Sequence, residues 1–157
     1  MIVAALVLIL STAMFCFYFQ VTCQRILRRQ FDREYFRSIA NANRLEFLSL
    51  QKSVEEMGAA VDYPRLRMVL RCDFLALTYL LKNAANVSQR YSRDERLLVL
   101  YFRYLFVSLA VRRLLRLGEN TAILKLTSVL QYFANVIGQR VNAVTFGCLT
   151  ADYLLNS

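Results

Sequence analysis

The chain opens with an apolar run that contains no charged residue and neither Gly nor Pro: Ile2-Val-Ala-Ala-Leu-Val-Leu-Ile-Leu-Ser-Thr-Ala-Met-Phe-Cys-Phe-Tyr-Phe-Gln-Val21. As an α-helix with a rise of about 1.5 Å per residue, this run would be roughly 30 Å long, the thickness of the hydrocarbon core of a bilayer. We therefore expect residues 1–24 to form a transmembrane anchor that contacts the lipid bilayer.

A cleaved signal peptide is the alternative to a retained anchor. A signal peptide would carry a basic segment before the apolar run and a small-residue cleavage site after it. Nothing basic precedes Ile2 except the amino terminus itself, and Phe15 stands before Cys16 where a lipoprotein would need a small residue. Arginines follow the run on its carboxyl-terminal side, so the positive-inside rule predicts a single-pass protein with its amino terminus outside and its domain in the cytoplasm.

Composition favours helices for the rest of the chain. The 157 residues leave about 130 beyond the anchor, enough for one compact domain. Only four Gly and one Pro occur, and Leu and Arg are frequent, which favours long helices over strands. The expected fold is all-α, with one amino-terminal transmembrane helix followed by an antiparallel bundle of four or five helices. The expected segments are the anchor, a basic juxtamembrane helix over 25–61 and a cytoplasmic helical bundle over 62–157.

A cluster of arginines follows the apolar run: Arg25, Arg28, Arg29, Arg33 and Arg37. Four of them are spaced four residues apart and would form a stripe on one face of a helix. No helix breaker lies between Val21 and Glu56, so the anchor is expected to continue into the cytoplasm without a joint. The stripe is a candidate membrane-surface site, worth about 1 kcal/mol per cation on anionic lipid. The alternative is a stop-transfer signal whose arginines form ordinary ion pairs.

The first bundle helix is expected from about Tyr63 to Asn86. Asp62 is a good N-cap, and Pro64 is tolerated in the first turn of a helix. The predicted apolar stripe consists of Leu66, Leu70, Phe74, Leu77, Leu81 and Ala84.

Two further helices are expected after this one. Ser92-Arg-Asp-Glu95 has the pattern of a capping box and opens a helix that ends near Leu117, before Gly118. The next helix is expected from Thr121 to Ile137, closed by Gly138. We expect the tail, residues 139–157, to fold back on the bundle as a final helix or turn.

A buried polar layer is predicted inside the bundle. Asp73 lies on an otherwise apolar stripe, and Arg103 lies in the middle of an apolar run at about the same height of an antiparallel hairpin. Asn135 reaches that height on the next helix. Burying one charge alone costs several kcal/mol, so two opposed charges at one height predict an ion pair. The alternative is that Arg103 points outward and Asp73 faces solvent.

No pattern of a catalytic, metal or cofactor site is present. The chain has no His, and its four Cys form no CxxC pair. A His base, a phosphate-binding loop and paired carboxylates on one helix face are all lacking, so we expect no enzyme activity and no cofactor. The net charge of +9, with Arg beside aromatic residues, is compatible with nucleic acid, but aromatic residues at helical spacing are more often core.

The favoured function is that of a membrane-tethered helical scaffold or accessory subunit, which binds a protein partner or a second copy at the cytoplasmic membrane face. The alternative is a regulatory helical domain that binds a small ligand between its helices. An exposed apolar patch would favour the scaffold, whereas an enclosed cavity lined by polar groups would favour the ligand-binding domain.

Overall fold

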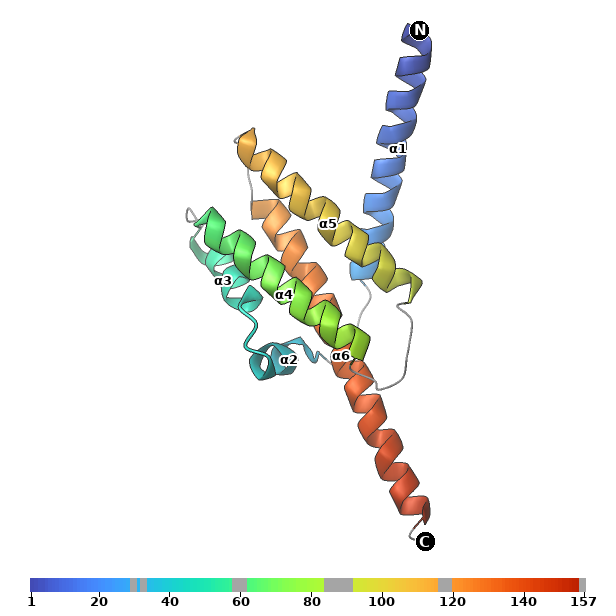
Figure 1. Ribbon diagram of the computed structural model, residues 1–157, viewed down its shortest axis with the longest axis vertical. Coiled ribbons are helices and arrows are strands. Elements are labelled where there is room, and N and C mark those ends of the chain that lie inside the picture. Colours follow the sequence, from blue (N-terminus) through green and yellow to red (C-terminus); the bar gives the residue numbers. More distant parts are fainter. Residues whose placement is uncertain (29–30, 32–33, 58–61, 84–91, 116–119, 156–157) are drawn as a thin grey trace.

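The computed structural model describes residues 1–28, 31, 34–57, 62–83, 92–115 and 120–155, without the side chains of residues 2, 56–57 and 144–155. The described residues form helices and no strand, which confirms the all-α class (Figure 1). The helices are α1 (Ile2–Leu27), α2 (Phe36–Ala42), α3 (Phe47–Met57), α4 (Tyr63–Asn83), α5 (Arg93–Leu114) and α6 (Asn120–Leu155).

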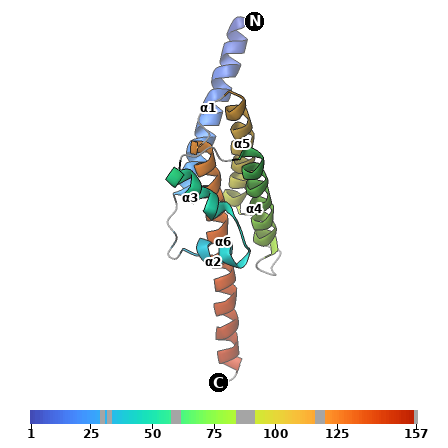
Figure 2. The ribbon, with the colours of Figure 1, turned by 90° about the vertical axis from the view of Figure 1, so that its left-hand side faces the viewer.

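The domain is built around α6, which contacts each of the helices from α2 to α5. Figure 2 shows α4 and α5 on one side of α6, with α2 and α3 on the other side. Because it is covered from both sides, α6 is buried around most of its circumference between Ala122 and Gly138, as expected for a core helix. Its buried apolar residues are Ala122, Ile123, Leu126, Val129, Leu130, Tyr132, Phe133, Ala134 and Ile137.

The helices α4 and α5 form an antiparallel pair that covers α6 (Figures 1 and 2). The predicted stripe of α4 is buried from Leu66 to Leu81, while Ala84 lies outside the described residues. Between the two helices, the rings of Phe74 and Phe102 stack with their centroids 4.0 Å apart and their planes 1° from parallel.

The predicted capping box at the start of α5 is present. Ser92 is the N-cap, and its backbone N–H donates to the Glu95 carboxylate over 3.0 Å. The helix ends at Leu114, three residues before the predicted end, and Gly118 lies outside the described residues.

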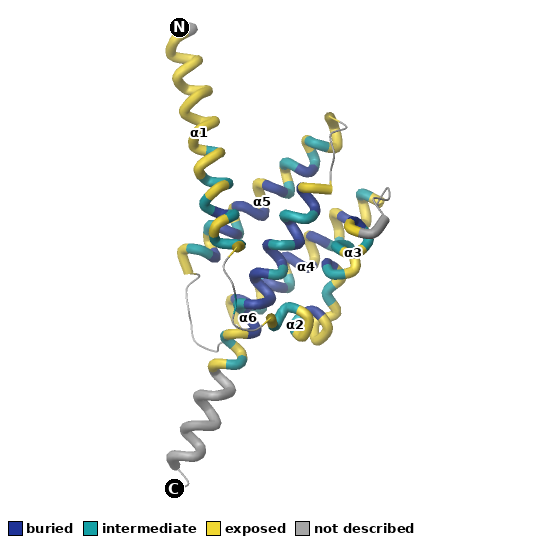
Figure 3. Tube along the Cα trace, turned by 180° about the vertical axis from the view of Figure 1, so that it is seen from behind, coloured by how far each residue is buried: buried dark blue, intermediate teal, exposed yellow. Residues whose placement is uncertain are grey.

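Helix α1 divides into an exposed part and a packed part. From Val3 to Tyr18 its residues are exposed, apart from the half-buried Cys16 (Figure 3). From Phe19 onward the helix packs on α5 and α6, and Cys23 is fully buried. The segment Val3–Leu27 is long and apolar enough to cross a membrane, and its most apolar window is not covered by the rest of the protein.

The expected continuous helix over 25–61 does not form. Helix α1 ends at Leu27, and α2 and α3 follow as separate helices. Arg44, between α2 and α3, has a positive φ of 52°, which breaks the helical path there. This part of the chain folds back against α6 because the short helices bury residues such as Ala40 and Phe47 on it.

The expected end of α6 at Gly138 is also wrong. The helix runs through Gly138 to Leu155, so residues 139–155 continue it and do not turn back on the bundle. At Gly138 the backbone of α6 lies very close to the Tyr35 side chain. A Cβ atom at this position would lie 2.1 Å from the Tyr35 Cβ atom. The missing side chain therefore gives the Tyr35 side chain room against α6.

Candidate functional site

Two buried polar side chains cap the short helices from a distance in the sequence. The Asp73 carboxylate on α4 accepts the Phe47 backbone N–H over 2.8 Å, at the first turn of α3. The Asn135 side-chain oxygen on α6 accepts the N–H groups of both Tyr35 and Phe36 over 2.8 Å, at the start of α2. Backbone N–H groups in the first turn of a helix have no partner within that helix, so α4 and α6 supply the missing acceptors.

Burial raises the pKa of the Asp73 carboxyl above its ordinary value, because an ionised carboxylate loses hydration there. The backbone N–H groups of Phe47 and Glu46 oppose this shift, and the nearby Glu46 carboxylate adds slightly to it. The Asp73 side chain therefore caps α3, and its carboxylate loses hydration by doing so.

Arg103, the third residue of the predicted layer, lies elsewhere. It is exposed on the outer side of α5, while Asp73 and Asn135 are buried. The buried positions of α5 at this height are the neighbouring Phe102 and Leu105, so Arg103 points away from the core. The structure thus replaces the proposed Asp73–Arg103 pair with two separate helix caps and one surface cation.

The juxtamembrane arginines do not form a single stripe. Arg25 is exposed in the last turn of α1, and Arg28 is exposed as its C-cap. Arg37 belongs to α2, where its guanidinium lies 5.7 Å from the centroid of the Phe36 ring. Arg29 and Arg33 lie outside the described residues.

A polar link that the sequence analysis did not predict joins three helices. Arg140 on α6 donates to the Glu95 carboxylate on α5 and, over 3.1 Å, to the Leu81 carbonyl oxygen near the end of α4. Both side chains are mostly buried, with exposures of 18 % for Arg140 and 4 % for Glu95. Arg140, placed just beyond an apolar helical stretch, was a signal that could have suggested such a pair.

The outer surface formed by α4 and α5 is apolar and basic. We call it the α4–α5 face and define it by the exposed residues Met68, Arg71, Leu75, Tyr79, Leu100, Arg103, Val107 and Leu114. Its five exposed aliphatic residues and Tyr79 are all more than half exposed. Spacings of three, four and seven residues place the members of each helix on one side of that helix. An exposed apolar surface of this extent is typical of an interaction site.

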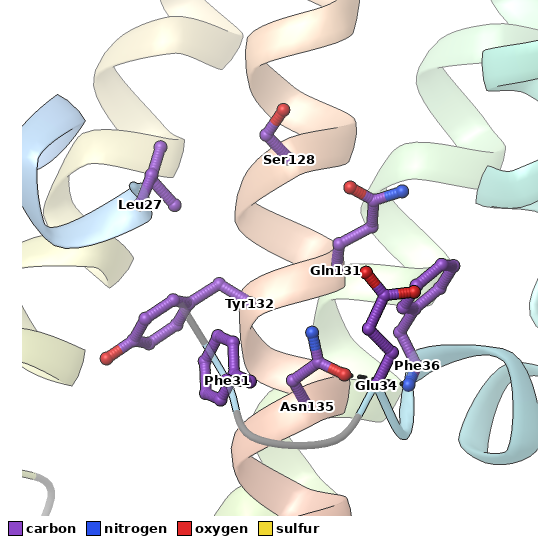
Figure 4. A pocket seen from close by; sticks show the side chains of 8 residues that line it. All are labelled: Leu27, Phe31, Glu34, Phe36, Ser128, Gln131, Tyr132 and Asn135. Atoms are coloured by element: carbon purple, nitrogen blue, oxygen red, sulfur yellow. Dashed lines mark hydrogen bonds between the residues drawn. The ribbon is translucent and has the colours of Figure 1, made fainter. Parts of the chain in front are cut away.

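A recess of about 420 Å³ lies where the chain passes from α1 to α2 along α6. Figure 4 shows Glu34, Gln131, Tyr132 and Asn135 around it. Several polar atoms that line this recess already form hydrogen bonds with other parts of the protein. Asn135 caps α2, and Gln131 donates to the Gln51 side chain over 2.7 Å. These contacts leave fewer groups to bind a ligand.

The described residues contain no group of three or more His, Cys, Asp or Glu side chains that could hold a metal ion. Among the described thiols, Cys16 is half-buried, Cys23 is buried and Cys72 is exposed on α4. In a comparison with known proteins, no family model, no curated protein and no solved structure matches this chain.

Proposed function

We propose that this protein is a membrane-tethered helical scaffold or accessory subunit that holds a protein partner at the cytoplasmic face of a membrane. One observation carries the proposal: α1 is exposed and apolar over most of its length, yet its last turns are packed into the domain. An anchor of this kind would concentrate the domain at the membrane and limit its orientation there.

The contacts between α1 and α5 support a fixed attachment. The Phe19 ring meets the rings of Tyr101 and Tyr104 edge-on, with centroid distances of 6.0 and 6.5 Å. The Gln20 side-chain amide donates to the Tyr104 hydroxyl over 3.0 Å. A flexible tether would lack such contacts, so α1 and the bundle would move together.

The arginines at the end of α1 support the proposed orientation. Arg25 and Arg28 are exposed where the apolar segment ends, and no basic side chain precedes them. Exposed cations at this position favour the cytoplasmic side of a membrane and attract anionic head groups. In this proposal the basic residues that bind the membrane surface are Arg25, Arg28, Arg29, Arg33 and Arg37.

A small-ligand function is the second candidate, and the recess beside α6 is the observation that favours it. It has a volume suited to a small molecule, about 420 Å³, and Glu34 adds a charged group. We favour the scaffold because the polar groups of the recess already cap and bridge the surrounding helices, whereas the α4–α5 face presents its apolar residues to solvent.

Labelling of Cys72 tests the anchor and the orientation. Cys72 is exposed on α4, so a variant with Cys16, Cys23 and Cys148 changed to Ala keeps one reporter thiol in the domain. In intact cells, a membrane-impermeant maleimide should leave Cys72 unmodified, and permeabilisation should expose it. The protein should also stay in the membrane fraction after alkaline extraction. Labelling in intact cells, or release on extraction, would contradict the proposal.

A further inference from the structure

The α4–α5 face contains a groove of about 410 Å³ with an aromatic floor and basic rims. The rings of Phe74, Phe102 and Phe106 line it, and Arg71 on α4 and Arg103 on α5 line it as well. A further guanidinium, that of Arg67, lies 5.4 Å from the centroid of the Phe106 ring. The groove therefore combines apolar surface with cations from both of its helices.

The charged residues of the α4–α5 face, Arg71 and Arg103, are both basic. Between Tyr63 and Asn83 the only acidic residue is Asp73, which is buried and caps α3. From Arg96 to Leu114 α5 contains no acidic residue at all. Because neither helix offers a carboxylate to these arginines at the surface, the face attracts an acidic ligand.

Two alternative occupants fit this face poorly. A second copy that docks with the same face would bring arginines against arginines, which costs several kcal/mol in like-charge repulsion. A bilayer crossed by the exposed part of α1 would reach the end of α5 that lies beside α1, but most of α4 and the first half of α5 lie farther along the long axis (Figures 1 and 2). A separate protein with complementary charge fits both conditions.

We propose that the α4–α5 face binds an acidic amphipathic helix of a partner protein. The inference rests on the proposed scaffold function and names the class of partner. Neighbouring helices leave a groove between them that accepts the apolar side of a third helix, with anchors at positions i, i+3 or i+4, and i+7. In this arrangement Leu75 and Val107 contact the apolar anchors. Glu or Asp residues beside these anchors pair with Arg71 and Arg103, since guanidinium groups bind carboxylates through paired hydrogen bonds.

Site-specific photocrosslinking in the full-length protein tests this proposal. Benzoylphenylalanine replaces Leu75 or Val107 in the groove, and it replaces the exposed Lys52 on α3 as the control position. After irradiation of cells, mass spectrometry identifies the crosslinked peptides. The groove positions should both react with one segment of one other protein, in which acidic residues flank apolar residues at helical spacing, and Lys52 should not react with that segment.

Charge reversal makes the test specific. The double variant Arg71→Glu and Arg103→Glu should lower the crosslinking yield at Val107 by about tenfold or more. The matched double variant Lys52→Glu and Arg44→Glu, at exposed positions outside the face, should leave the yield unchanged. A synthetic peptide of the crosslinked segment should bind the unmodified protein, and a version with Lys in place of its acidic residues should bind the Arg71/Arg103 variant better. Thermal unfolding of each variant shows whether its fold is retained.

The outcomes separate the two proposals. Adducts with lipid, with a second copy, or with a segment that lacks acidic residues would overturn the groove assignment, as would a yield that charge reversal leaves unchanged. If Lys52 captures a protein and the groove positions do not, the scaffold function stands and the inferred docking site is wrong. If no position captures a protein, both proposals fail.

Discussion

Helices α1 and α6 are both long and apolar, but they are in opposite surroundings. The most apolar window of α1 has a mean hydropathy of 2.0 and is not covered by other parts of the protein. The first half of α6 is covered by four other helices, and Leu126, Val129, Leu130, Phe133 and Ala134 are fully buried. Among the described residues α1 alone is long and apolar enough to cross a membrane, and the two helices differ in burial as well.

The polar residues of the two helices show the difference. In its exposed part, up to Tyr18, α1 has no charged side chain, and Thr12 donates to a carbonyl group of the same helix. In α6, by contrast, Asn135 and Arg140 bind the backbone of other helices. A core helix holds its neighbours through such groups, whereas a helix in lipid satisfies its polar groups internally.

The largest expected effect comes from placing a charge in the buried part of α6, and the same change on α1 is the control. Leu130 on α6 is fully buried, so Leu130→Asp would bury an unpaired carboxylate and should destabilise the domain by about 5 kcal/mol or more. Leu10→Asp on the exposed part of α1 is the control and should leave the thermal unfolding of the domain in detergent almost unchanged. Similar losses from both variants would show that α1 is part of the core.

The link between Arg140 and Glu95 should have the next largest effect. Glu95→Ala would leave the Arg140 guanidinium mostly buried without its carboxylate, and we expect a loss of about 3–5 kcal/mol in the free energy of unfolding. Arg140→Ala should cost a similar amount, and the double variant should cost clearly less than the sum. Additive losses in this double-mutant cycle would exclude an interaction between the two side chains.

Membrane retention should depend on the charge at Leu10 of α1, although the unfolding of the domain should not. A charged residue in the central part of a spanning helix costs about 3 kcal/mol on insertion. Leu10→Asp should therefore increase the share of protein released from membranes by alkaline extraction, while Leu10→Ala should not. If the Asp variant is retained as well as the unmodified protein, insertion of α1 is not what holds the protein there.

The close contact at Gly138 should give a smaller loss. Gly138→Ala would place a Cβ atom 2.1 Å from the Tyr35 Cβ atom, which lies too near the backbone to move independently. We expect a loss of about 1–3 kcal/mol, as for overpacked sites in general, despite the better helix propensity of Ala. Urea unfolding measures this loss, and Gln139→Ala at an exposed neighbouring position is the control. A more stable Gly138→Ala variant would contradict the close packing of Tyr35.

The smallest effect is expected at Asp73. Asp and Asn are nearly equal as helix caps, so Asp73→Asn should change stability by less than about 1 kcal/mol at neutral pH. Asp73→Leu should lower stability more, because it removes the acceptor of the Phe47 N–H. The pKa of Asp73 is raised in the folded state, so the native protein holds this proton more tightly than the unfolded chain. The stability that this raised pKa contributes to the folded state is complete below the unfolded pKa, near 3.8. It is lost as the pH rises through the folded pKa.

Thermal unfolding across this pH range checks the sign. The melting temperature of the unmodified protein, relative to that of Asp73→Asn, should fall as the pH increases above about 4. A rise over the same range would mean that the backbone hydrogen bonds outweigh the loss of hydration.

Local patterns in the sequence were enough to predict several features. Uncharged residues from Ile2 to Val21 indicated an apolar helix, and the Ser92–Glu95 pattern placed the start of α5. The α4 stripe was also readable, because helical periodicity brings residues three and four positions apart to one side. Each of these features depends on residues close together in the chain.

Tertiary structure decided the features that depend on distant residues. Only the fold shows that Asn135 and Asp73 cap α2 and α3, that Arg103 faces outward, and that Gly138 lies inside α6. The sequence distance from Tyr35 to Asn135 is 100 residues. Periodicity within one helix states which residues share a side, but packing selects the neighbour that this side meets, and with it the partner of every buried polar group.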